Sequence, residues 1–318
     1  MERSFDAVPA EFVVPYVWLD GALVPSAAAQ VPIMTHTLHY GLGAFEGIRA
    51  YDGAQGPAVF RLQEHLERLA RSAAMLHVPM PFSTAELVAA CTTTLASNGL
   101  RAGYLRPVVL VDDGRRGLGA MHNRTRVAVV VWPWGTYLGE EGVQRGIRAQ
   151  VSATVRMNAR SFLPKGKING QYVNSVLAKR AALLAGYEEA ILLDDDGHVA
   201  EATGENLFLV QGGTLVTPPL SQPILAGITR ASVLDLAGDL GLPVVERSFG
   251  RDTLYVADEV FLCGTAAEIT PVREIDGHRI GNGARGPWTE RIQARYRDAV
   301  LGRLPDRLGW LTPYRVGG

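Results

Sequence analysis

Residues 165–172 read Lys-Gly-Lys-Ile-Asn-Gly-Gln-Tyr, and residues 201–206 read Glu-Ala-Thr-Gly-Glu-Asn. A lysine beside a glycine loop is usually a solvated surface charge, because lysine is seldom buried without a partner. If the fold brings Lys167 and Glu201 together, however, the two side chains could form a catalytic site. An amine that can form an imine with an aldehyde, and a carboxylate that keeps a ring nitrogen protonated, are what a pyridoxal phosphate (PLP) site requires.

The chain has the size and composition of a globular protein with more than one core. Its 318 residues exceed a typical single domain, and 47% hydrophobic with 20% charged residues argues against a disordered or fibrous protein. Thirty-one basic and 32 acidic residues leave a net charge of −1, which gives no indication of nucleic acid or membrane binding. We expect a cytoplasmic protein, because no signal-like segment and no apolar run of about 18 residues is present.

The two cysteines, Cys91 and Cys263, lie far apart and outside any metal-ligand spacing. We therefore expect neither a disulfide framework nor a zinc site.

The first half of the chain predicts strands and two helices. Leu62, Leu66 and Leu69 share one face of an amphipathic helix. Ser83 with Glu86 three residues later is a capping box, which opens a second helix that stops at residues 98–99. Strands are expected at residues 16–19, 58–60, 105–111 and 126–132.

The pattern restarts after the Gly- and Pro-bearing segment 133–139, which marks the best domain boundary. We expect a small N-terminal domain at 1–133, an interdomain loop at 134–142 and a larger domain at 143–318. Hairpin turns at 195–197 and 212–213 favour an α+β fold over a doubly wound sheet. The second half predicts helices at 172–185 and 229–240, and strands at 147–155, 190–194, 207–210, 214–216, 244–247 and 259–262.

Two segments could bind an anion. Gly227-Ile-Thr-Arg230 lies where a helix begins, so the N–H groups of Ile228 and Thr229 could bind a phosphate. Cys263-Gly-Thr-Ala-Ala-Glu268 follows a strand and could present N–H groups and a hydroxyl. An ordinary helix start and an ordinary tight turn are the alternatives.

Other motifs in the sequence give little or no support for a nucleotide, metal or serine hydrolase site. Residues 41–47 are glycine-rich but match neither GxGxxG nor the P-loop pattern. His36, His39 and Glu46 fit no zinc spacing, and a buried loop network is the preferred interpretation, so no metal site is expected. Ser161 and Ser175 lie outside any GxSxG motif, so serine hydrolase chemistry is a weak option.

Seven ordered segments resemble the fold-type IV PLP-dependent enzymes, and most closely the branched-chain amino acid aminotransferases. The resemblance extends from Tyr16 to about Ile292 and implies a two-domain α+β fold like that of D-amino acid aminotransferase, with a small N-terminal α/β domain and a larger PLP-binding domain. The segments are 39–41 with 45–49, 64–69, 104–107, 133–139, 201–208, 227–230, and 257–261 with 264–271.

The resemblance implies a role for each matching residue of the cofactor site. Lys167, and not its neighbour Lys165, matches the catalytic lysine, because it directly precedes the x-x-Gly-x-Tyr pattern. Tyr172 matches the partner of the cofactor's phenolic oxygen, and Glu201 the partner of its ring nitrogen. The phosphate-binding positions fall on Arg68, Ile228, Thr229 and Thr265.

The resemblance likewise implies a substrate pocket that accepts an aliphatic side chain among aromatic rings. Arg106 matches the residue that receives the distal carboxylate of glutamate. In the family, the loop that matches 112–125 reaches over the partner subunit's pocket, and here it carries Arg115 and Arg116. The other pocket positions are Tyr40, Phe45, Tyr104, Tyr137, Thr265 and Ala266.

We therefore expect reversible transamination between leucine, isoleucine or valine and 2-oxoglutarate, in a homodimer or higher homo-oligomer. The alternatives are another fold-type IV transaminase, acting on D-amino acids, aromatic amino acids or amines, and a lyase of the aminodeoxychorismate type. A non-catalytic binding or assembly module is a further alternative, which the four residues Arg68, Lys167, Tyr172 and Glu201 argue against.

Overall fold

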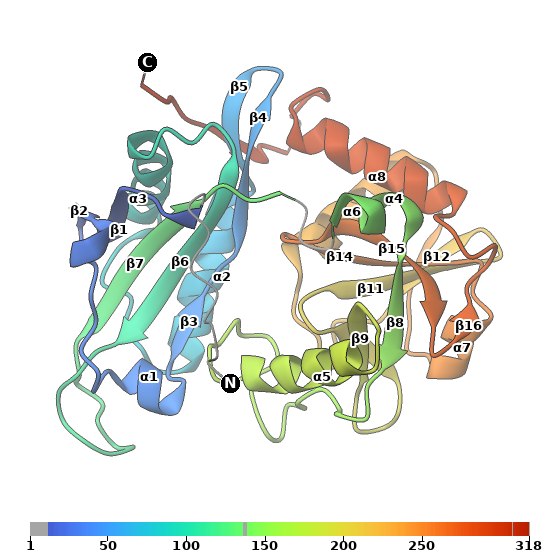
Figure 1. The fold of residues 1–318 in the computed structure, drawn as a ribbon, viewed down its shortest axis with the longest axis horizontal. Helices are drawn as coiled ribbons and strands as arrows, with labels where there is room; N and C mark the ends of the chain where they lie inside the picture. The colour runs from blue at the N-terminus through green and yellow to red at the C-terminus, as the bar shows by residue number, and fades with distance from the viewer. Residues whose placement is uncertain (1–11, 136–138, 307, 318) are drawn as a thin grey trace, which may run out of the picture.

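The computed structural model describes residues 12–135, 139–306 and 308–317. The chain forms two bodies that lie side by side, each built on one β-sheet (Figure 1). The N-terminal half forms the first body, and most of the C-terminal half forms the second. Mixed helices and sheets confirm the predicted α+β class.

The first sheet is antiparallel and has the strand order β17-β5-β4-β6-β7-β1-β2, with β3 beside β6. Its long central pair, β6 and β7, buries alternate side chains, as expected for strands with one face on a core. Its strands are β1 (Tyr16–Leu19), β2 (Ala22–Pro25), β3 (Gly43–Phe45), β4 (Ile48–Gly53), β5 (Gly56–Phe60), β6 (Gly103–Val111), β7 (Thr125–Trp132) and β17 (Leu311–Pro313).

Two helices, α2 (Leu62–Met75) and α3 (Thr84–Ser97), cover one face of this sheet. The leucines predicted to share a face of α2 are fully buried in the first core. The capping box of α3 is present, because the Ser83 hydroxyl accepts from the Glu86 N–H and the Glu86 carboxylate accepts from the Ser83 N–H. Both predicted helices are confirmed. A short helix, α1 (His36–Tyr40), lies at one end of the sheet.

The second sheet has the order β10-β9-β8-β15-β14-β11-β12-β13, with β16 beside β15. Both predicted hairpins, β9 with β10 and β11 with β12, are antiparallel, whereas β8 pairs in parallel with β9 and β15. Its strands are β8 (Ile147–Val151), β9 (Glu189–Leu193), β10 (Val199–Ala202), β11 (Asn206–Gln211), β12 (Thr214–Thr217), β13 (Val244–Glu246), β14 (Glu259–Gly264), β15 (Glu268–Ile275) and β16 (His278–Arg279).

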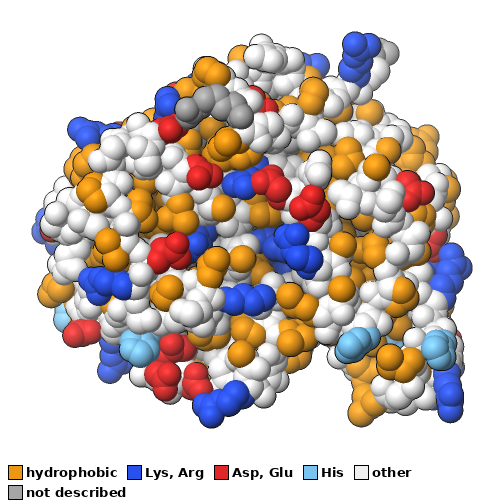
Figure 2. Space-filling view, turned by 180° about the vertical axis from the view of Figure 1, so that it is seen from behind, with side chains coloured by type: hydrophobic (Ala, Val, Ile, Leu, Met, Phe, Trp, Pro, Cys, Tyr) orange, Lys and Arg blue, Asp and Glu red, His pale blue; other side chains and the backbone are white. Residues whose placement is uncertain are grey.

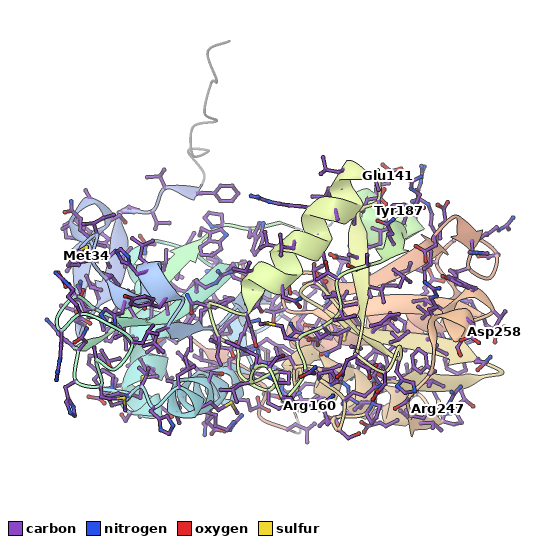
Figure 3. All side chains as sticks on the ribbon, turned by 90° about the horizontal axis from the view of Figure 1, so that it is seen from below. Met34, Glu141, Arg160, Tyr187, Arg247 and Asp258 are labelled. Atoms are coloured by element: carbon purple, nitrogen blue, oxygen red, sulfur yellow. The ribbon has the colours of Figure 1, made fainter. Side chains whose placement is uncertain are left out.

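Helices pack against the second sheet, and two of them, α5 and α6, begin near the junction of the two bodies. Helix α5 begins at this junction and runs outward along the second body (Figures 1 and 3). Helices α6 and α8 pack with strands β11 and β14 around one core. The helices are α4 (Gly139–Arg145), α5 (Tyr172–Leu184), α6 (Ile228–Asp239), α7 (Arg251–Tyr255) and α8 (Pro287–Val300).

The end of the chain returns to the first body. Strand β17 pairs with β5, and Trp310 packs on Phe60 with the ring centroids 5.5 Å apart. Pairing covers the edge of β5, which would otherwise expose unpaired backbone groups. The predicted domain limits therefore differ from the sheets at this strand, which lies in the first sheet although it follows residue 143. The boundary at 134–142 stays a prediction.

Charges of both signs are interspersed on the surface. Figure 2 shows basic and acidic side chains together near the middle of one face. This distribution agrees with the net charge of −1. Among the described residues, no helix is long and apolar enough to cross a bilayer.

Candidate active site

A cavity lies where segments of both bodies meet. Arg68 on α2 and Tyr104 on β6 line it from the first body. The second body contributes the chain from 167 to 175, the turn at 201–206, the start of α6 and the turn at 264–266. The cavity thus joins chain segments that lie more than 100 residues apart in the sequence.

Lys167 lies in this cavity, and its Nζ is 2.6 Å from the Oη of Tyr172 at the start of α5. The Lys167 N–H donates to the Ser72 hydroxyl, which ties the lysine backbone to α2. Lys165 does not line the cavity. Its Nζ donates to the carbonyl oxygens of Gln222 and Ile224, at 2.7 and 2.9 Å. Burial lowers the pKa of Lys165.

Glu201 is buried in the same cavity and accepts three hydrogen bonds. The donors are Arg156 Nε at 2.8 Å, Asn206 Nδ2 at 3.0 Å and the Leu225 N–H at 3.0 Å. Burial raises the pKa of Glu201, and Arg156 opposes this shift. Three fixed donors hold the carboxylate in one orientation.

Arg156 was missed by the sequence analysis. The only signal was an arginine directly after the alternating apolar and polar residues predicted as a strand at 147–155. That strand ends earlier, at Val151, so Arg156 lies in the following loop.

A set of donors that could bind an anion lines another part of the cavity. Helix α6 has no side-chain cap, so the N–H groups of Ile228 and Thr229 have no capping side chain as a partner. A Cβ at Gly227 would lie 1.9 Å from Asn206 Oδ1, so only glycine fits before this helix. Arg68 and Thr265 line the same cavity.

Arg68 is oriented by a buried carboxylate. Its Nε and Nη2 donate to Glu46, at 2.6 and 2.9 Å, and Glu46 also contacts His65 Nδ1 at 2.7 Å. Although burial alone raises the pKa of Glu46, Arg68 and His65 hold it well below its ordinary value. Glu46 therefore belongs to a buried network, but with these partners and not with His36 or His39. No cluster suited to a metal ion occurs among the described residues.

Aromatic rings and an arginine lie beside Lys167. The Phe45 ring is 4.7 Å from the Tyr172 ring and 4.7 Å from the Arg106 guanidinium carbon. Arg106 also lies over Tyr104 at 5.5 Å, and its buried Nε has no hydrogen-bond partner within the described part of the chain. A cation stacked on aromatic faces keeps its charge near an apolar surface.

Of the predicted pocket residues that the structure describes, Tyr104, Thr265 and Ala266 line the cavity, whereas Phe45, Arg106 and Tyr40 do not. Tyr40 is 50% exposed and does not line the cavity of its own chain. Tyr137 lies outside the described residues. Thr265 and Ala266 do line the cavity, so the turn predicted to present N–H groups reaches it. Arg115 and Arg116 are exposed on the loop at 112–125, where Arg116 pairs with Asp113.

Glu205 is a second cavity residue that the sequence analysis did not identify. It is buried, and its pKa is raised to about 8 by burial and by Glu189. The ammonium group of Lys179 is paired with Glu189, to which its Nζ donates at 2.5 Å. Within the described residues, Glu205 thus lacks a cation of its own.

Comparisons with known proteins identify the family of this chain. The family model for class IV amino-transferases matches residues 43–275. The chain is 43% identical to the branched-chain-amino-acid aminotransferase of Pseudomonas aeruginosa over 296 residues, which cover 93% of this chain and 96% of the relative. It is 44% identical to that of Salmonella typhimurium over 299 residues, with 94% and 97% covered.

Solved structures of the same kind superpose closely. The Escherichia coli branched-chain amino acid aminotransferase has a TM-score of 0.93 at 42% identity and covers 95% of this chain and 99% of its own. The T.th. enzyme with pyridoxamine 5'-phosphate has a TM-score of 0.92 at 45% identity, with the same coverage. The predicted fold-type IV architecture is thereby confirmed. The chain belongs to the class IV aminotransferases, in the branched-chain-amino-acid aminotransferase family.

Proposed function

We propose that this chain catalyses reversible amino transfer between leucine, isoleucine or valine and 2-oxoglutarate, with PLP as cofactor. The observation that carries the proposal is the meeting of Lys167 and Glu201 in one cavity with Arg68. Relatives at about 43% identity named for this reaction support it. The alternative fold-type IV activities gain no specific support from the site.

The described residues fit a PLP molecule. Arg68, the first N–H groups of α6 and Thr265 would hold its phosphate, because this set combines a cation with uncapped helix donors. Glu201 would hold the ring nitrogen, and Tyr172 the phenolic oxygen. Bound there, PLP supplies a protonated ring that withdraws electrons from the carbon bearing the substrate amine.

Lys167 would carry the proton. Its Nζ would accept a proton from the substrate Cα as a general base and, as a general acid, deliver it to the carbon that takes up the amino group. Tyr172, at 2.6 Å, limits the positions of this amine. Glu201 contributes by charge, and its three donors keep the carboxylate in place.

The substrate pocket must accept two different side chains in turn, since the two amino acids of a transamination occupy one site successively. Phe45 and Tyr104 offer an apolar surface to the branched side chain. Arg106, stacked on both rings, can pair with the distal carboxylate of glutamate.

We also propose a homodimer in which Tyr40 and the loop at 112–125 contribute to the partner's cavity. On this loop Leu118 is 87% exposed and Met121 63% exposed, and exposed apolar side chains of this size mark an interaction surface. Light scattering after size-exclusion chromatography measures the mass of the assembly. The cytoplasmic location stays a prediction.

The first experiment is a visible absorption spectrum of the purified protein with PLP. We expect a band that is lost on addition of L-leucine or L-glutamate and restored by their 2-oxoacids. Loss with glutamate but not leucine would keep the enzyme class and contradict the branched-chain substrate. The absence of any band after PLP addition would contradict the proposed catalytic role of Lys167.

A further inference from the structure

Glu268 begins β15 in a conformation that side chains seldom adopt. Its φ is +52°, in the left-handed region where a Cβ meets the backbone. It directly follows the turn Gly264–Ala267, whose Thr265 and Ala266 line the cavity. The path of this turn into the cavity therefore depends on a strained residue.

Two side chains of the first body hold the Glu268 carboxylate. Tyr51 Oη donates to Glu268 Oε1 at 2.7 Å, and Arg49 Nη1 lies 3.5 Å from the same oxygen. Arg49 and Tyr51 are two residues apart on β4, so both point from one face of the sheet. Burial raises the pKa of Tyr51 well above its ordinary value, so the hydroxyl remains a donor.

Arg49 makes two further contacts from its buried position, where it is 9% exposed. Its Nη2 donates to the carbonyl of Gly135, just after the start of the predicted interdomain loop, at 2.5 Å, and to the carbonyl of Ala266 at 3.1 Å. One guanidinium thus joins the first sheet, the connecting segment and the turn of the cavity. A lysine ammonium lacks the planar set of donors needed for all three contacts.

We propose that Arg49, Tyr51 and Glu268, called here the cross-sheet cluster, are positioning residues that hold the turn Gly264–Ala267 in the shape used for substrate binding. The proposal rests on the proposed function, because Thr265 and Ala266 matter only if the cavity takes a substrate. The cluster itself does not line the cavity, so it acts through the backbone of the turn.

The chain contains a matched control at the other end of the same strand. Asp276 follows β15 with φ at +50°, and Tyr255 Oη donates to its Oδ2 at 2.8 Å. Neither residue lines the cavity. Tyr51→Phe and Tyr255→Phe therefore each remove one hydroxyl from an acidic residue with positive φ, but only Tyr51→Phe acts next to the turn.

The test compares these two variants by hydrogen exchange and by kinetics. For Tyr51→Phe we expect faster amide exchange in residues 264–268 and a fall of about tenfold in kcat/KM for L-leucine, mainly through KM, because a hydrogen bond to a charged group is lost. Tyr255→Phe should leave both quantities unchanged. Wild-type exchange and wild-type KM in Tyr51→Phe would overturn the proposal.

A second variant separates the effect of the strained backbone at Glu268 from the effect of its carboxylate contacts with β4. Glu268→Gly removes the carboxylate and adopts positive φ without steric cost, so the protein should still fold, which circular dichroism checks. We still expect faster exchange at 264–268 and a raised KM, because the contacts with β4 are gone. Unchanged exchange in this variant would contradict the cluster's role. If the wild-type protein has no transaminase activity, the proposed function fails, whereas the exchange comparison still tests the contact.

Discussion

The Nζ of Lys167 lies 2.6 Å from the Oη of Tyr172, while the Nζ of Lys165, two residues earlier, is held by backbone carbonyls outside the cavity. Two lysines of one short loop thus have different surroundings. The Lys167 N–H donates to the Ser72 hydroxyl on α2, and this hydrogen bond fixes the backbone at Lys167 next to the first body. Only one of the two amines faces the residues proposed to bind the cofactor.

This difference predicts opposite outcomes for two alanine variants. Lys167→Ala should remove the visible band of the PLP-treated protein and lower kcat by at least about 100-fold, since a positioned proton carrier is lost. Lys165→Ala should keep the band and most of the activity. Absorption spectra and steady-state rates with L-leucine check both. A band that survives in Lys167→Ala but not in Lys165→Ala would reverse the assignment.

Substitution of Arg106 should change the selectivity of the enzyme between glutamate and leucine. In Arg106→Met the distal carboxylate of glutamate loses a charge-assisted partner worth about 1.5–3 kcal/mol, so kcat/KM for glutamate should fall by at least about tenfold. The value for leucine should change much less, because methionine keeps an apolar surface beside Phe45. The ratio of the two values is the quantity to measure. An equal loss for both donors would show that Arg106 does not discriminate between them.

Glu205 predicts a pH-dependent stability. Its pKa is raised from 4.5 to about 8 in the folded protein, so the folded state binds more protons than the unfolded state between these values. Its contribution to stability is therefore lost progressively as the pH rises from about 4.5 to about 8. Glu205→Gln cannot ionise, and its Tm relative to wild type should increase from pH 5 to pH 8.5. A difference in Tm that stays constant over this range would contradict a protonated Glu205.

Alanine substitutions at two glycines, one directly before α6 and one within it, should change the stability of the protein in opposite directions. Gly227→Ala would place a Cβ 1.9 Å from Asn206 Oδ1, and Asn206 also donates to Glu201. We expect weaker PLP binding, measured by fluorescence titration, and a lower Tm. Gly238→Ala lies in the same helix with no atom within 4 Å of the added Cβ. It should stabilise the protein by up to about 1 kcal/mol, without a change in PLP affinity.

Local sequence patterns were enough to predict several helices and the candidate residues of the site. The leucine spacing of α2 and the capping box of α3 depend on residues within one or two helical turns, so they could be read without tertiary structure. Lys167 and Glu201 could be singled out by the chemistry of their side chains, and Tyr172 by the resemblance to the fold-type IV enzymes. The start of α6 could be read from the glycine that precedes it.

The contacts between side chains far apart in the sequence could not be predicted from local patterns. Arg156 contacts Glu201 from 45 residues away, and Tyr51 contacts Glu268 from 217 residues away, across two sheets. Tyr40 was predicted in the pocket, yet it lies outside the cavity of its own chain. Such contacts depend on how two separately formed sheets pack, and no periodicity along one segment carries that information. Local hydrogen bonds and side-chain spacing specify the elements, whereas burial between the sheets selects the partners.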